Sequence, residues 1–164
     1  MKKIVLLVGC CLFFVFSCQK DQQAEWKPLE LLQYGLPVTV LAPDSAAVKS
    51  DDLGGLIKDV TVKGGDDYSI QIYATDATTT DLAKVKAAQL AEVKSNRYFS
   101  KIIEEEENGF LYEMKLDSTN INYGFRHVRV QGDMEFVFQP SLIGTFTLEE
   151  ARRMYEAVKP QPRK

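Results

Sequence analysis

One histidine and two neighbouring arginines are the side chains in this 164-residue sequence that come closest to a chemical site. His127 is the only imidazole, and it lies between Arg126 and Arg129 in a segment of alternating residue types. A catalytic histidine needs a nucleophile or a carboxylate partner, and the sequence contains no Gly-x-Ser-x-Gly or comparable motif. The alternation predicts a strand with Val128 and Val130 on its core face, and with His127 and Arg129 on the opposite face.

Three interpretations of this segment remain open. Arg126, His127 and Arg129 are ordinary strand residues, at the surface or beneath a helix, or they form a small anion-binding patch. In the third interpretation these residues form the centre of a hydrolase-type or small-ligand-binding enzyme, whose acidic residues come together only in the folded chain. We expect the ordinary role, because no partner for the imidazole stands out in the sequence.

Acidic residues are grouped in the chain, but their spacing does not favour a metal site. Residues 104–107 are four glutamates just before Asn108-Gly109, and consecutive strand residues point to opposite faces, so these carboxylates cannot converge. The loop pattern of an EF-hand is missing. We therefore expect a solvated hairpin tip here, and neither a metal nor a cofactor in the protein. Asn108-Gly109 itself predicts a type I′ turn, in which both residues have positive φ.

Two aromatic residues are candidates for binding. Tyr73 and Phe125 fall on the strand faces opposite their apolar neighbours. If no helix covers them, they form an exposed patch for a partner or an apolar ligand. A sheet that is covered on both faces explains them equally well.

The amino terminus has the composition of an export signal. Lys2 and Lys3 precede an apolar run at residues 4–16, and polar residues follow Ser17-Cys18. The run is shorter than the roughly 20 residues that a membrane-spanning helix needs. It has the length of the central region of a secretory signal.

The residues at the end of this run resemble the lipobox of bacterial lipoproteins. Val15, Ser17 and Cys18 fit that motif, whereas Phe16 is larger than the usual residue. The resemblance implies that the signal is cut before Cys18, which receives a diacylglycerol thioether and an acylated (palmitate-type) amine. Several acyl chains give stable anchoring in a membrane. An ordinary secretory signal, cut nearby, is the alternative.

The expected location is therefore the cell envelope, with the chain anchored by lipid in the outer membrane. Residues 19–21 resemble the lysine-plus-acid signal that sends some lipoproteins to the cell surface, but only one acid follows the lysine. The periplasmic and the surface face both remain open. Cys10 and Cys11 leave with the signal, so no disulfide is expected.

The rest of the chain predicts an α+β fold. Alternating apolar residues predict strands, and a spacing of three to four residues predicts helices. We expect an antiparallel sheet of about six or seven strands in the order βββ-α-ββββ-α, packed against two helices. The predicted strands lie at residues 36–42, 56–62, 68–74, 98–106, 110–116, 122–130 and 134–139, and the helices at residues 80–95 and 147–159.

The ends of these elements carry recognisable signals. One of the threonines at 78–80 is expected to cap the first helix, and Thr147 with Glu150 forms a capping box for the second. Residues 44–55 are predicted to be a loop. The sequence divides into a signal peptide (1–17), a lipidated polar tether (18–33) and a single domain (34–160).

This order of elements resembles the PsbP-like fold, named for the extrinsic protein of the oxygen-evolving photosystem. The resemblance rests on element order between residues 36 and 158 and implies no function.

Composition limits the partners. The sequence has 20 basic and 23 acidic residues and a formal net charge of −3, which becomes more negative once Lys2 and Lys3 are removed. Nucleic acids and anionic lipids select for basic proteins, so no nucleic-acid partner is expected. We expect a non-enzymatic envelope lipoprotein, a binding or interaction module that meets the membrane through its anchor and an envelope protein or small ligand through its domain. The alternative is an enzyme around His127.

Replacing Cys18 by Ser tests the lipobox resemblance. We expect an uncleaved or soluble form, because serine cannot receive the thioether. Mass spectrometry of the wild-type amino terminus is the measurement, and an unmodified cysteine would contradict the anchored location.

Overall fold

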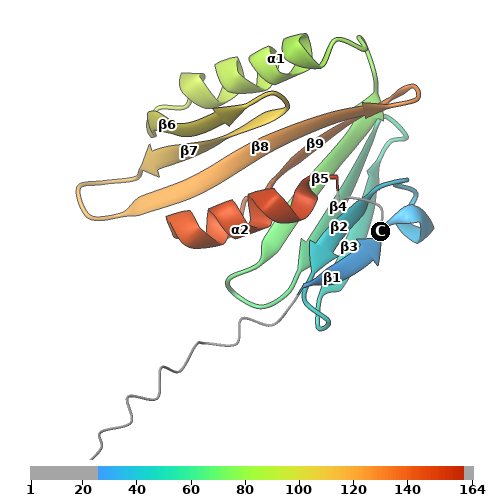
Figure 1. The fold of residues 1–164 in the computed structure, drawn as a ribbon, viewed down its shortest axis with the longest axis horizontal. Helices are drawn as coiled ribbons and strands as arrows, with labels where there is room; N and C mark the ends of the chain where they lie inside the picture. Colours follow the sequence, from blue (N-terminus) through green and yellow to red (C-terminus); the bar gives the residue numbers. More distant parts are fainter. Residues whose placement is uncertain (1–25, 161–164) are drawn as a thin grey trace, which may run out of the picture.

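Seven strands pair in one antiparallel sheet, in the spatial order β3-β4-β5-β9-β8-β7-β6 (Figure 1). The computed structural model describes residues 26–160 of the chain. The fold class is therefore confirmed as α+β, with a seven-stranded antiparallel sheet and two α-helices. The elements are β3 (Ala47–Leu53), β4 (Ile57–Lys63), β5 (Ser69–Asp76), α1 (Leu82–Ser95), β6 (Phe99–Glu106), β7 (Gly109–Lys115), β8 (Ile121–Gln131), β9 (Met134–Pro140) and α2 (Leu148–Val158).

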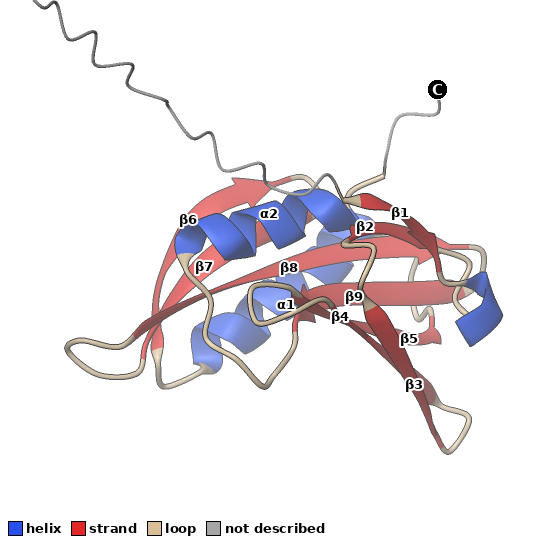
Figure 2. Ribbon diagram, turned by 90° about the horizontal axis from the view of Figure 1, so that it is seen from below, coloured by secondary structure: helices blue, strands red, loops and turns tan. Residues whose placement is uncertain are grey.

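The two helices cover opposite faces of the sheet (Figure 2). Helix α2 packs on one face against β7, β8 and β9, and α1 packs on the other face against β6 and β8. We call these the α2 face and the α1 face. Helix α1 does not cover the whole width of its face, because it has no extensive contact with β3, β4 or β5.

The larger core lies on the α2 face. In β5, Ile70, Ile72 and Ala74 alternate onto this face and are buried, as their period-2 spacing predicted. They pack with residues of β8, β9 and α2, among them Phe125, Phe136, Phe138, Met154 and Tyr155.

A smaller core lies under α1. Val85 of α1 packs on Val128 and Val137, and Val93 packs on Phe110 and Tyr112. Strand β8 is therefore covered on both faces in its central part.

A second, two-stranded sheet extends the α2 side and corrects the expected start of the domain. β1 (Lys27–Glu30) pairs antiparallel with β2 (Thr39–Ala42), and the short 3-10 helix η1 (Leu32–Tyr34) joins them. Leu31 is fully buried, and Trp26 meets Tyr68 edge to face with ring centroids 4.7 Å apart. The expectation of a polar tether without strands up to residue 33 is therefore wrong for the part after residue 25. Cys18 lies outside the described residues.

The predicted loop at residues 44–55 is also wrong. Ala47–Leu53 forms β3, an edge strand that pairs with β4 along its whole length. Its side chains are mostly exposed on both faces, so it has no apolar alternation that the sequence could reveal. Charged residues on such an edge are typical, since they discourage pairing with another chain.

Helix caps agree with the sequence at one helix and differ at the other. Thr147 and Glu150 form the expected capping box of α2. At α1 the cap is Asp81, whose carboxylate accepts from the backbone N–H groups of Ala83 and Lys84 at 3.1 and 3.3 Å, and not one of the preceding threonines. Aspartate is preferred at the N-cap at least as strongly as threonine, so the observed cap agrees with the known residue preferences.

The β6–β7 hairpin turns one residue earlier than expected and in a different conformation. Glu106 pairs with Gly109, so the turn residues are Glu107 and Asn108, and no described residue other than glycine has positive φ. Gly109 is also absent from the glycines with positive φ, so the type I′ prediction is wrong. Gly109 is needed for space, because a Cβ there would lie closest to the backbone carbonyl oxygen of Arg126, and 2.7 Å from the hydroxyl oxygen of Tyr155.

The expectation that the glutamates of this hairpin are solvated is only partly correct. They alternate between the two faces, and three of them reach helices on either side of the sheet. The ion pairs are Glu104 with Arg152 of α2, Glu105 with Lys86 of α1, and Glu106 with Lys159 at the end of α2.

No helix within residues 26–160 is both long and apolar enough to cross a membrane.

Replacing Gly109 by Ala tests how closely β8 and α2 pack around this glycine. We expect a loss of about 1–3 kcal/mol in the free energy of unfolding, because the new methyl group collides with the backbone carbonyl oxygen of Arg126 and with Tyr155. Gly132→Ala gives a comparison of another kind: a Cβ there would meet nothing within 4 Å, so any loss of stability comes from the positive φ of 65° alone and not from a collision. Chemical denaturation of both variants gives the comparison. An unchanged midpoint for Gly109→Ala would show that neither β8 nor α2 packs closely against this residue.

Candidate functional site

Strand β8 divides the candidate residues between the two faces of the sheet. Register with its neighbours places Phe125, His127 and Arg129 on the α2 face, opposite Leu111, Phe138 and Phe136 respectively. Arg126 and Val128 lie on the α1 face. The predicted alternation is therefore present, but the assignment of the core is wrong, because His127 faces the larger core. Phe125 is fully buried there, so it is not part of an exposed patch.

His127 is sealed beneath α2. Its side chain is among the buried ones, with the residue 5% exposed, and its ring lies 5.7 Å from that of Phe138 and 6.1 Å from that of Tyr155. Burial, together with the nearby charges of Arg129 and Lys159, lowers the pKa of His127 from 6.5 to about 4. The imidazole is therefore neutral at physiological pH. Among the described residues its Nδ1 atom has no hydrogen-bond partner.

The charged groups around His127 hold α2 on the sheet. Glu106 accepts hydrogen bonds from Tyr155 Oη at 3.0 Å and from Lys159 Nζ at 2.8 Å. The bond from Lys159 holds the pKa of Glu106 below its usual value. Arg129 donates to the carbonyl oxygen of Val158 at 2.9 Å, which satisfies a free carbonyl at the helix end. These contacts fasten the helix and engage Glu106, the acid whose charge acts on the imidazole.

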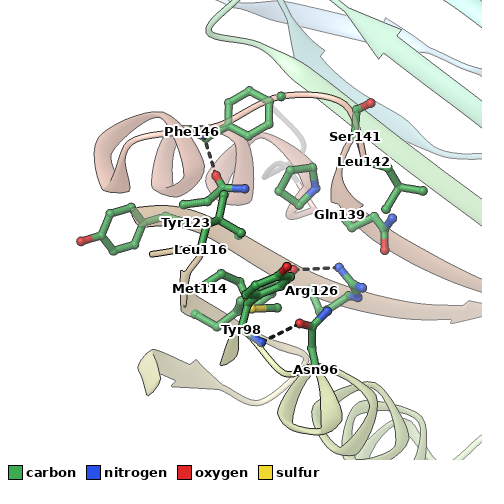
Figure 3. Close-up of a pocket in the computed structure, with 15 residues that line it drawn as sticks. Asn96, Tyr98, Met114, Leu116, Tyr123, Arg126, Gln139, Ser141, Leu142 and Phe146 are labelled. Atoms are coloured by element: carbon green, nitrogen blue, oxygen red, sulfur yellow. Dashed lines mark hydrogen bonds between the residues drawn. The ribbon is translucent and has the colours of Figure 1, made fainter. Parts of the chain in front are cut away.

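A pocket lies on the α1 face, beyond the carboxyl end of α1 (Figure 3). Its volume is about 230 Å³. It opens between the start of β6, the middle of β8 and the segment that joins β9 to α2. Aromatic and aliphatic side chains provide much of its lining, among them Tyr98, Met114, Tyr123, Leu142 and Phe146.

Arg126 is the charged group of this pocket. The residue is 9% exposed, and its guanidinium donates to Tyr112 Oη at 3.1 Å and to Gln89 Oε1 at 3.2 Å. Its ion-pair partner is Glu92 on α1, at 3.7 Å, with a side chain that is 64% exposed. An exposed ion pair of that length contributes little to stability. We call this hollow the Arg126 pocket.

Gly124 gives the Arg126 pocket its shape. It pairs with Tyr112 across β7 and β8, and a Cβ at this position would lie 2.6 Å from the Tyr112 ring. The missing side chain lets the ring lie flat across β8. Tyr112 can then reach Arg126 with its hydroxyl group.

A second pocket of about 310 Å³ lies along α1, over β5 and β9. Tyr73, Glu92, Glu135 and Val137 line it, and Gln139 lines both pockets. Tyr73 is half-buried here on the α1 face, so the structure does not bring it together with Phe125.

A row of buried amides crosses the sheet between the two pockets. Gln139 donates to Gln71 Oε1 at 3.3 Å, and Gln71 donates to both carboxylate oxygens of Asp59 at 2.8 and 3.0 Å. Gln139 therefore uses its amide nitrogen within the sheet while it lines both pockets.

Exposed apolar residues lie at the Arg126 pocket and next to its lining in the chain, and we call them the rim. Leu116 and Leu142 line the pocket and are 41% and 76% exposed. Ile121 and Ile143, which adjoin the lining residues Asn122 and Leu142, are 42% and 89% exposed. Such a group of large apolar side chains at a pocket mouth is typical of an interaction surface.

Within residues 26–160, no group of three or more His, Cys, Asp or Glu residues is arranged to hold a metal ion. Comparison with protein-family models, curated proteins and solved structures gave no match for this chain.

Sequence reasoning identified Arg126 but missed its surroundings. Tyr112 and Gln139 lie on β7 and β9, and Tyr98 and Phe146 lie in the loops before β6 and α2, so no spacing in the chain connects them. Gly124 was the one available signal, because a glycine inside a strand often marks a close approach of another group.

The low pKa of His127 predicts a pH-dependent stability. Because the folded-state pKa is about 4 and the unfolded value is 6.5, this group's contribution is complete above pH 6.5 and is lost as the pH falls toward 4. The loss amounts to at most roughly 3 kcal/mol. His127→Leu removes the titrating group while keeping an apolar side chain, so its free energy of unfolding should change less over this range. Urea unfolding at pH 7, 6, 5 and 4.5 is the measurement, and equal slopes for the two proteins would refute the buried neutral imidazole.

Proposed function

We propose that this protein is a non-enzymatic, lipid-anchored envelope protein that binds its partner through the Arg126 pocket. The observation that carries the proposal is the pocket itself, in which a nearly buried guanidinium lies among aromatic rings beneath an exposed apolar rim. Ligand sites commonly combine apolar walls with a few polar groups that fix orientation.

The size of the pocket limits what enters it. Its volume of about 230 Å³ is below the roughly 300–1,000 Å³ of typical drug-sized sites. A small molecule or one end of a larger partner fits such a space. Leu142 and Ile143 offer a larger partner further contact outside the pocket.

An enzyme centred on Arg126, His127 and Arg129 has less support. Strand β8 directs Arg126 to the face opposite the other two, so the three groups cannot act on one substrate. His127 is buried among rings, and Arg129 is engaged at the end of α2.

The anchor and the fold resemblance complete the proposal. The lipobox-like residues up to Cys18 support attachment to the outer membrane, with either face open. We also keep the PsbP-like resemblance as a proposal about fold, supported by the order of strands and helices. In this proposal the lipid contacts the membrane, and the pocket contacts an envelope protein or a small ligand. Nucleic acid is not among the proposed partners.

Variants of the rim and of His127 separate the two candidate functions. Leu142→Gln combined with Ile143→Gln changes only exposed side chains, so the protein should fold normally and lose most of what it binds. His127→Leu should bind as the wild type does. Each lipidated protein is captured from membranes, and the molecules retained are compared quantitatively by mass spectrometry.

The opposite pattern would contradict the proposal. If His127→Leu loses the bound set while it still folds, and the rim variant keeps it, the function depends on the imidazole and the enzyme becomes the better hypothesis.

A further inference from the structure

We propose that the Arg126 pocket binds a carboxylate carried by a small apolar or aromatic group of about amino-acid size. This inference rests on the proposed function and specifies the chemistry of its ligand.

The charge of the pocket favours an anion. Arg126 is the only charged residue among the fifteen that line it, in a protein that is acidic overall. The second pocket, by contrast, is lined by Glu92 and Glu135. An anionic ligand is therefore attracted to the first pocket and repelled from the second.

The guanidinium of Arg126 has hydrogen-bonding capacity to spare. It donates to three uncharged oxygens, those of Tyr112, Gln89 and the Phe125 carbonyl. Glu92 approaches the Nη2 atom only to 3.7 Å and is largely in water. A buried cation with mainly neutral partners is costly, and a carboxylate that pairs with the guanidinium offsets that cost.

Tyr112 adds a second donor beside the guanidinium. Its hydroxyl oxygen accepts from Arg126, so its own proton is available to a ligand oxygen. Burial raises the pKa of Tyr112, which keeps this proton on the hydroxyl group. Two adjacent donors match the two oxygens of a carboxylate.

The rest of the pocket indicates the body of the ligand. Tyr98 and Tyr112 contribute aromatic side chains, and Met114 and Leu142 contribute aliphatic ones. A phosphate group would need more positive charge than one guanidinium, because it carries up to two negative charges. The lining therefore fits an apolar acid better than a phosphorylated compound.

Isothermal titration with N-acetylphenylalanine tests the inference, with N-acetylphenylalaninamide as the neutral match. The full lipidated chain is used in zwitterionic nanodiscs, and empty nanodiscs give the blank. We expect the acid to bind at least tenfold more tightly than the amide. Arg126→Gln should remove this preference, and circular dichroism checks that the variant is folded.

Glu92→Gln keeps Arg126 intact and should change the affinity for the acid in the opposite direction. Removing the competing carboxylate should tighten binding of the acid severalfold and leave binding of the amide unchanged. Glu107→Gln is the matched control: it makes the same change in charge at an exposed residue of the β6–β7 turn, at the other end of β7. It should have no effect.

Three outcomes would overturn the inference: equal affinity for acid and amide, no binding of either compound at millimolar concentration, or a preference for the acid that survives in a folded Arg126→Gln protein. If a neutral compound binds equally well and the rim variant still loses its partner, the proposed function stands and only the carboxylate is wrong.

The source of the carboxylate is separated by a further comparison. An acetylated tetrapeptide ending in phenylalanine that binds tenfold more tightly than the free acid indicates a polypeptide carboxyl terminus, with added contact at the rim. Equal affinity indicates a small free acid.

Discussion

Strand β8 is covered by a helix on each face, and the rest of the structure depends on this constraint. Because side chains along a strand alternate, residues 125–129 are sent in turn into two different cores. Phe125 joins the larger core against α2, and Val128 joins the smaller one against α1. A shift of one residue in the register would exchange the two sets, so burial on both faces fixes it firmly.

The same constraint separates the residues that sequence reasoning had grouped together. On the α2 face, His127 and Arg129 belong to the surface against which α2 packs. Beside them, Glu106 accepts hydrogen bonds from Tyr155 and Lys159. On the α1 face, Arg126 is buried at the edge of the helix and stays accessible from one side. Helix α1 ends at Ser95, and the uncovered surface beyond it becomes the wall of the pocket.

The sequence predicted the elements with clear apolar periods and missed those without them. The alternation of β5 and the capping box of α2 were recognised because each is a local pattern. The sequence predicts a loop where β3 lies, because an edge strand with both faces in water needs no apolar residues and so shows no apolar alternation. Alternation in β8 was recognised, but its larger core was assigned to the wrong face, because both faces of that strand carry apolar residues. The pocket was out of reach for another reason. Its lining comes from strands and loops that only the pairing order of the sheet brings together.

The division of β8 is tested most directly by nuclear Overhauser contacts in the labelled protein. The account predicts cross-peaks between the methyl groups of Val128 and Val85, and between the rings of Phe125 and Tyr155, whose centroids lie 5.7 Å apart. Cross-peaks from Val128 to Tyr155, with none to Val85, would contradict it. They would place Arg126 on the α2 face and remove the charged group from the pocket.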